Sequence, residues 1–335
     1  KELGLEGAAS AAWNLKGPLE TPTLALEIRS SRVTVPERAT LAGMKILTKV
    51  SLPLSGDTPD MRLDMAAESL ELPSGTLSNL RTAFTVSSGV MNIENARGEI
   101  LGACLSLTGS ARLPSPNRAG GVDLKGTATG VDLSMLGDRI PFEIHGPLET
   151  DFAIKGDLPI PEITLSGRSP SIVLAGLNLS DLTFNARGDA SRMTLEDLKG
   201  FAGRGALTVT GTADILPGGV DLDFSLEGSG LDLALVTKEI QGNGRPPLAG
   251  TADVALSGSL EKGAWKVRGT IFSETLAAYG IDFDDVTLPV TLEEGSMRVE
   301  NATGRFCEGR LSGGGDVETA TGRWNIRAAV RGADM

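Results

Sequence analysis

Few side chains in this chain have the chemistry to act at a reactive site, and His145 is the first of them. It is the only histidine and ends an alternating segment, Phe142-Glu143-Ile144-His145. A zinc site takes several His, Cys or carboxylate ligands at defined spacings, and this segment lacks that layout. We therefore expect His145 to be a solvent-facing strand residue, and we expect no metal site.

The two cysteines are the next candidates for chemistry, as partners in a disulfide. Cys104 and Cys307 are the only cysteines and lie far apart in the sequence. A disulfide needs Cα atoms within about 7 Å, so we expect no intrachain bridge. Both cysteines are predicted to be small strand residues that fill space.

The acidic segment Asp282-Phe283-Asp284-Asp285 suggests calcium at first sight. It lacks the alternating ligands, the central glycine and the closing glutamate of a calcium-binding loop. We predict that it begins a strand instead. The sequence also contains no nucleophile elbow, zinc-protease motif or P-loop. We expect no catalytic residues and no cofactor, and therefore no enzyme.

Composition points to many short strands. The chain has 335 residues, a net charge of −12, 43 Gly and 17 Pro, but only 9 Phe, 3 Trp and 1 Tyr. The acidic balance argues against a nucleic-acid partner, which needs clustered Lys and Arg. Aliphatic pieces cut by glycine are typical of all-β chains. No apolar run reaches the roughly 18–20 residues of a membrane span, and the first residues do not resemble a signal peptide. We expect an internal part of a longer protein.

A long repeat organises the sequence. Residues 91–98 (MNIENARG), 193–200 (MTLEDLKG) and 297–304 (MRVENATG) match, and the steps from 91 to 193 and from 193 to 297 are 102 and 104 residues. Internal repeats of fixed period indicate stacked structural units. We predict a partial repeat over 1–55, repeats over 56–155 and 156–257, and a partial repeat over 258–335, in one continuous elongated domain.

Within each repeat the apolar residues alternate with polar ones. Val220, Leu222, Phe224 and Leu226 are each followed or preceded by Asp, Ser or Glu. This period of two predicts strands with one apolar and one solvated face, as antiparallel sheets show. We expect these four side chains to share one concave face with Leu105, Leu107, Leu207 and Val209.

Two short segments break the alternation. Residues 132–136 and 232–240 each open with an Asp that follows a Gly-x pair. An Asp side chain can accept hydrogen bonds from the first backbone N–H groups of a helix. We predict one or two helical turns there, capped by Asp132 and Asp232.

A sheet of this length must cover or use its apolar face. At about 4.8 Å between strands, a repeat of six or seven strands advances the sheet by about 30 Å. Such a sheet can pack on a second sheet, wind into a solenoid or curl into a trough. A trough leaves a large apolar surface open, which marks an interaction site, and extended acyl chains fit it. From the residues alone, a closed core is equally consistent.

The motifs G-x-L-x-x-P (residues 17–22 and 156–161), M-x-[IVL]-E-[ND]-x-x-G and L-x-[LV]-x-G (105–109 and 207–211) span roughly Gly17 to Met335. They resemble the β-repeat region of the AsmA-like superfamily, the TamB- and YhdP-like bacterial envelope lipid-transfer proteins. The resemblance implies a curled, taco-like antiparallel sheet with an open hydrophobic groove. It further implies phospholipid transport between the inner and outer membranes and a role in outer-membrane biogenesis. The resemblance also implies a periplasmic location, as part of an inner-membrane-anchored parent protein of a Gram-negative bacterium. It implies an outer-membrane protein as a further partner.

The groove predicted in this way is lined by the inward apolar side chains of the repeats. These are Leu105, Leu107, Val122, Leu124, Phe152, Ile154, Ile163, Leu165, Leu182, Phe184, Leu207, Val209, Val220, Leu222, Phe224, Leu226, Val254, Leu256, Trp265 and Val267. The alternative is a structural or adhesive β-solenoid stalk of an autotransporter-type surface protein, whose aliphatic face is a dry core. Solenoid coils repeat every 20–30 residues or so, which the long period here does not favour.

Overall fold

The computed structural model describes residues 6–18, 22–35, 39–51, 61–72, 75–100, 102–112, 114, 119–135, 143–174, 176–216, 219–236, 248–261, 263–278, 280–293, 295–318 and 323–332. The chain is all-β. In the described residues 21 strands form an antiparallel sheet that is not closed into a barrel, and strand makes up 87% of these residues against 3% helix. The predicted all-β, antiparallel class is confirmed.

The chain divides into two compact units, each described by itself. The first comprises Lys1–Met135 and Leu148–Leu165. It contains β1 (Glu6–Lys16), β2 (Thr23–Val35), β3 (Ala39–Ser51), β4 (Met61–Leu72), β5 (Gly75–Ser87), β6 (Val90–Ile100), β7 (Ala103–Arg112), β8 (Gly121–Asp132) and most of β10 (Pro147–Asp157).

The second unit comprises Leu136–Pro147 and Ser166–Met335. It contains β9 (Ile144–His145), most of β11 (Glu162–Leu174), β12 (Leu177–Gly188), β13 (Arg192–Ala202), β14 (Gly205–Leu216), β15 (Gly219–Asp232), β16 (Leu248–Glu261), β17 (Ala264–Ala278), β18 (Ile281–Glu293), β19 (Ser296–Phe306), β20 (Gly309–Glu318) and β21 (Arg323–Arg331).

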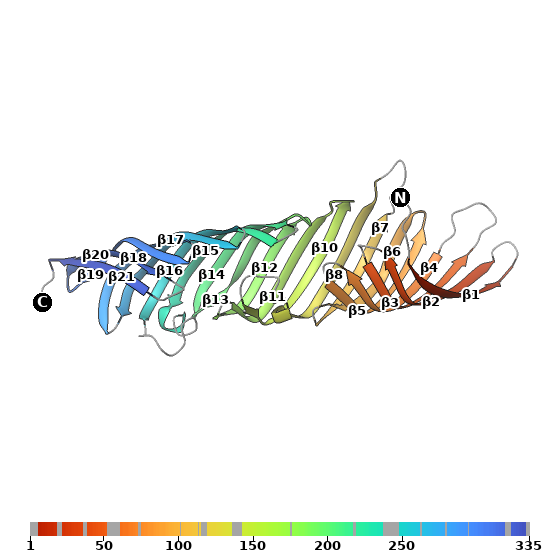
Figure 1. Cartoon of the computed structure of the whole chain (residues 1–335), viewed down its shortest axis with the longest axis horizontal. Helices are drawn as coiled ribbons and strands as arrows, with labels where there is room; N and C mark the ends of the chain where they lie inside the picture. The colour runs from red at the N-terminus through yellow and green to blue at the C-terminus, as the bar shows by residue number, and fades with distance from the viewer. Residues whose placement is uncertain are drawn as a thin grey trace. The chain divides into compact units, whose positions relative to one another are not determined.

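Consecutive strands pair as antiparallel neighbours in each unit. The order follows the chain from β1 to β8 in the first unit. It does so from β12 to β21 in the second, where Figure 1 shows the strands side by side. Alternating apolar and polar residues explain this arrangement, because every strand can turn its apolar residues to the same side.

One strand irregularity recurs along the chain. Asn79, Asp181 and Asp285 have positive φ angles of 53°, 50° and 49°. They lie in β5, β12 and β18, where the pairing with the next strand shifts register. Asn and Asp adopt this left-handed conformation more readily than other non-glycine residues. Their spacing equals that of the sequence motif, 102 and then 104 residues.

A buried serine recurs as well. Ser30, Ser169 and Ser273 are only 7%, 2% and 3% exposed. Each hydroxyl lies between a backbone carbonyl of the preceding segment and the carbonyl two residues further along its own strand. The oxygen pairs are Ala8 (2.6 Å) and Arg32 (3.0 Å), Pro147 (2.5 Å) and Ser171 (3.1 Å), and Thr251 (2.7 Å) and Thr275 (2.9 Å). The serine therefore supplies a donor where the ladder is interrupted.

The predicted helical turns are present. Residues 133–135 form a 3₁₀ turn and residues 233–236 an α-helical turn. Asp132 Oδ1 accepts a hydrogen bond from Ser134 N at 3.0 Å. Asp232 Oδ1 accepts from Ala234 N at 3.0 Å and Leu235 N at 3.2 Å. The capping roles of both aspartates are confirmed, while 136 and 237–240 lie outside the described residues.

Candidate functional site

The apolar face of the second unit is defined by strand register. Residues directly opposite each other on paired strands point to the same side of the sheet. Val209 lies opposite Leu226, and Leu226 lies opposite Leu256. Leu207 and Leu222 belong to the same side, since β14 and β15 pair without a register shift. The prediction that these residues share a face is confirmed for β14 and β15.

An aromatic pair stands out on this face. Phe224 lies opposite Gly211 on one side and Gly258 on the other. A Cβ atom at Gly258 would come within 2.8 Å of Phe224 Cζ, so the ring lies over the glycine. The ring centroids of Phe224 and Trp265 are 6.1 Å apart with planes at 74°, an edge-to-face contact. The glycines thus make room for the largest side chains.

The first unit has an apolar face of the same kind. Val122 lies opposite Ala111, and Leu124 lies opposite Gly109. Leu107 lies opposite Gly126, where a Cβ atom would clash with the Phe152 ring. Aromatic side chains over glycines therefore occur in both units.

Most of the predicted lining residues are half-buried. Of the twenty, Leu182 and Leu207 are buried at 4% and 7% exposure, Val220 is 39% exposed, and the other seventeen are intermediate. Among the described residues no large side chain is less than 2% exposed. The apolar face of each unit therefore keeps accessible surface.

A hollow in the second unit lies on the opposite, polar face. Its volume is about 940 Å³. Thr212, Asp223, Ser259 and Lys266 face each other in turn across β14 to β17 and line it. The sequence predicted concavity only on the apolar side, so this hollow is a departure. Short Ser and Thr side chains between longer charged ones explain it.

The remaining candidates for reactive or metal-binding chemistry are His145 and the acidic segment 282–285. His145 is an exposed residue of β9, as predicted, with Nε2 at 2.8 Å from Glu143 Oε1. The acidic segment 282–285 begins β18, also as predicted, and Asp285 pairs with Arg305 at 2.6 Å. The described part of the chain contains no group of three or more His, Cys, Asp or Glu side chains arranged to hold a metal ion.

The prediction that both cysteines are strand residues that fill space is correct only in that Cys104 lies in a strand. Both are free and exposed. Cys104 lies near the start of β7 but faces solvent, and Cys307 lies in the turn between β19 and β20 with a φ of 45°. Neither fills space in the interior, because alternation alone does not reveal a turn.

Three partly exposed carboxylates have pKa values below their ordinary range. The side-chain hydrogen bond from Lys199 lowers the pKa of Asp197, and that from Ser191 lowers the pKa of Asp189. A hydrogen bond from Arg29 lowers the pKa of Glu27. Hydrogen bonds favour the ionised form in each case. These shifts arise from pairing with residues close by, within the turn between β12 and β13 for Asp189 and on the strands for Glu27 and Asp197.

None of the family models, curated proteins or solved structures compared with the chain matches it. In the described residues there is no helix with the length and apolar character needed to span a membrane.

Proposed function

We propose that this chain is a lipid-carrying β-trough of the AsmA-like type, built from repeats of about 102 residues. Acyl chains of phospholipids would lie along the apolar face, with their headgroups toward water. The chain would act as part of a bridge that moves phospholipid between the inner and outer membranes and so supports outer-membrane biogenesis. The motifs of the sequence support the family, and the recurring bulge at Asn79, Asp181 and Asp285 supports the repeat.

One observation carries the proposal. In each unit, neighbouring strands turn apolar side chains to one side, and most of these remain half-buried. An apolar surface of several adjacent strands that keeps accessible area needs a partner. Long aliphatic chains match it, since the face offers Leu, Val, Ile and Phe at strand spacing.

The location and partners belong to the same proposal. A protein that carries phospholipid across the envelope would be periplasmic and part of an inner-membrane-anchored parent in a Gram-negative bacterium. Its partners would be phospholipid acyl chains, both membranes through other parts of the parent, and an outer-membrane protein.

A structural or adhesive stalk is the second candidate. Leu182, Leu207 and Leu260 are only 4%, 7% and 2% exposed, as in a dry core. A stalk would close its apolar face on itself and would carry no lipid.

Lipid extraction from the purified chain tests the proposal. Phospholipid should copurify with the chain and be identified by mass spectrometry. Phe224→Asp should reduce the lipid, because a carboxylate placed on the apolar face repels acyl chains. Ser225→Asp is the matched control, as the next residue faces the polar side, and it should keep the lipid. A chain without lipid, or equal lipid in both variants, would contradict the proposal.

A further inference from the structure

A row of cations crosses the polar face of the first unit. Arg29 of β2 lies opposite Lys45 of β3, and Lys45 lies opposite Ala66 of β4. Ala66 lies opposite Arg81 of β5, and Arg81 lies opposite Arg97 of β6. Four of five adjacent strands thus place a basic residue in one row, in a chain with a net charge of −12.

The row is interrupted where a hollow of about 470 Å³ opens. Ala66 and Ala83 form part of its floor, since neither has a side chain longer than a methyl group. Lys45 and Arg81 stand on either side of Ala66, and Asn95 lies beyond Ala83. Among the described residues that line the hollow, the one carboxylate is Asp64, on the strand between the two cations, and it pairs with Arg62 at 3.9 Å.

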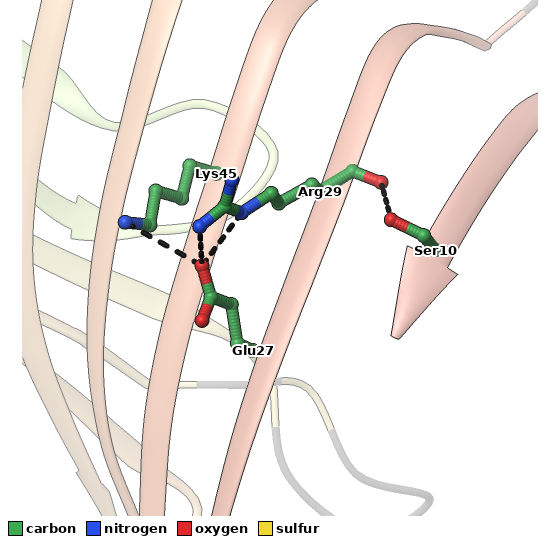
Figure 2. A network of polar contacts seen from close by, with 4 residues as sticks. All are labelled: Ser10, Glu27, Arg29 and Lys45. Carbon is green, nitrogen blue, oxygen red and sulfur yellow. Dashed lines mark hydrogen bonds and ion pairs between the residues drawn. The ribbon is translucent and has the colours of Figure 1, made fainter. Parts of the chain in front are cut away.

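Nearby acids neutralise only part of this row. Glu27 Oε1 forms ion pairs with both Arg29 and Lys45, as the dashed lines in Figure 2 mark. The nitrogen–oxygen distance is 2.6 Å for Arg29 and 3.5 Å for Lys45. The pKa of Glu27 is lowered chiefly by the hydrogen bond from Arg29. Glu27 is thus committed mainly to Arg29, and Lys45 keeps donor capacity toward the hollow.

Arg81 and Arg97 face each other across β5 and β6. Like charges directly opposite in a sheet destabilise it. Arg97 Nε donates to Asn95 Oδ1 at 3.2 Å. Among the described residues, neither arginine forms an ion pair with a carboxylate. An anion bound between them would relieve this repulsion.

We propose that the hollow over Ala66 and Ala83 binds a phosphate group, held by Lys45 and Arg81 with Arg97 beside them. Guanidinium groups match phosphate oxygens in pairs, and the lysine adds a point charge. The Asp64 carboxylate would accept a hydrogen bond from the P–OH group that inorganic phosphate or a phosphate monoester retains near neutral pH. The phosphate belongs either to a soluble molecule or to a lipid headgroup. This site lies on the face opposite the acyl-chain surface and does not depend on the proposed function.

Calorimetric titration of the whole chain with inorganic phosphate, at low ionic strength and in a phosphate-free buffer, tests the site. Millimolar binding is expected, and it should weaken as salt screens the charges. Arg81→Gln should weaken it about tenfold, as expected for loss of one charge-assisted hydrogen bond.

Two further variants separate a built site from diffuse charge. Lys125→Gln removes a cation of the same face on β8, outside the hollow, and it should leave binding unchanged. Ala66→Leu keeps every charge but fills the floor of the hollow, and it should abolish binding. Equal weakening by Arg81→Gln and Lys125→Gln, or full binding by Ala66→Leu, would overturn the proposal.

Vesicle flotation distinguishes the two sources of phosphate. Phosphatidylcholine vesicles with and without phosphatidylglycerol are compared for the parent chain and for Arg81→Gln. Arg81-dependent flotation with anionic vesicles assigns the site to a lipid headgroup. Phosphate binding without flotation assigns it to a soluble phosphate. Absence of both phosphate binding and flotation refutes the site.

Discussion

Replacing Phe224 by Asp tests whether the apolar face is open. Phe224 is half-buried, flanked by Gly211 and Gly258, and in edge contact with Trp265. A fully buried Phe removes roughly 200 Å² from water. Half of that area, at about 25 cal/mol per Å², corresponds to about 2.5 kcal/mol of stability lost with the ring.

The charge is separated from the lost ring by a second variant, Phe224→Ala. On an open face the Asp carboxylate reaches water, so the Asp and Ala variants should differ by less than about 1 kcal/mol. In a dry core the carboxylate would be buried without a partner, which costs several kcal/mol more.

Urea unfolding followed by tryptophan fluorescence gives both free energies of unfolding. Two losses near 2.5 kcal/mol support the open face. An Asp variant that is several kcal/mol less stable than the Ala variant refutes it and favours the stalk.

Four other outcomes follow from the structure. Ser273→Ala should cost about 1–2 kcal/mol of unfolding free energy in urea, because the carbonyls of Thr251 and Thr275 lose their donor. Gly258→Ala should destabilise the chain by about 1–3 kcal/mol, because the added Cβ would lie 2.6 Å from the Lys266 carbonyl oxygen and 2.8 Å from Phe224 Cζ. Phe224→Leu should restore the part of the loss that comes from the ring. The pKa of Asp197 is lower in the folded state than its ordinary value of 3.8. Its contribution to stability is therefore complete above pH 3.8 and is lost as the pH falls from there through the folded-state pKa. Asp197→Asn should make the urea midpoint depend less on pH in that range. The edges of β1 and β21, each paired on one side in the described residues, should associate with other chains, and concentration-independent light scattering at the monomer mass would contradict this.

Much of the fold was predictable because it depends on neighbours in sequence. Alternation over residues 220–226 predicted strands and their apolar side, and the register placed Leu207 and Leu222 together as expected. The caps at Asp132 and Asp232 were predictable for the same reason, since a cap bonds to residues two or three positions away. The bulges at Asn79, Asp181 and Asp285 have the same spacing along the chain as the sequence motif.

The contacts between side chains of different strands could not be predicted, because they depend on the register of the paired strands. The contact of Phe224 with Gly258 joins residues of different strands, and a shift of one residue would turn the ring to the other face. Lys45, Ala66 and Arg81 meet in one row only because three strands align at those positions. The sequence therefore determined which residues form strands and which side of each is apolar. Only the tertiary structure determined which side chains meet across the strands, because cross-strand contacts depend on register and not on distance along the chain.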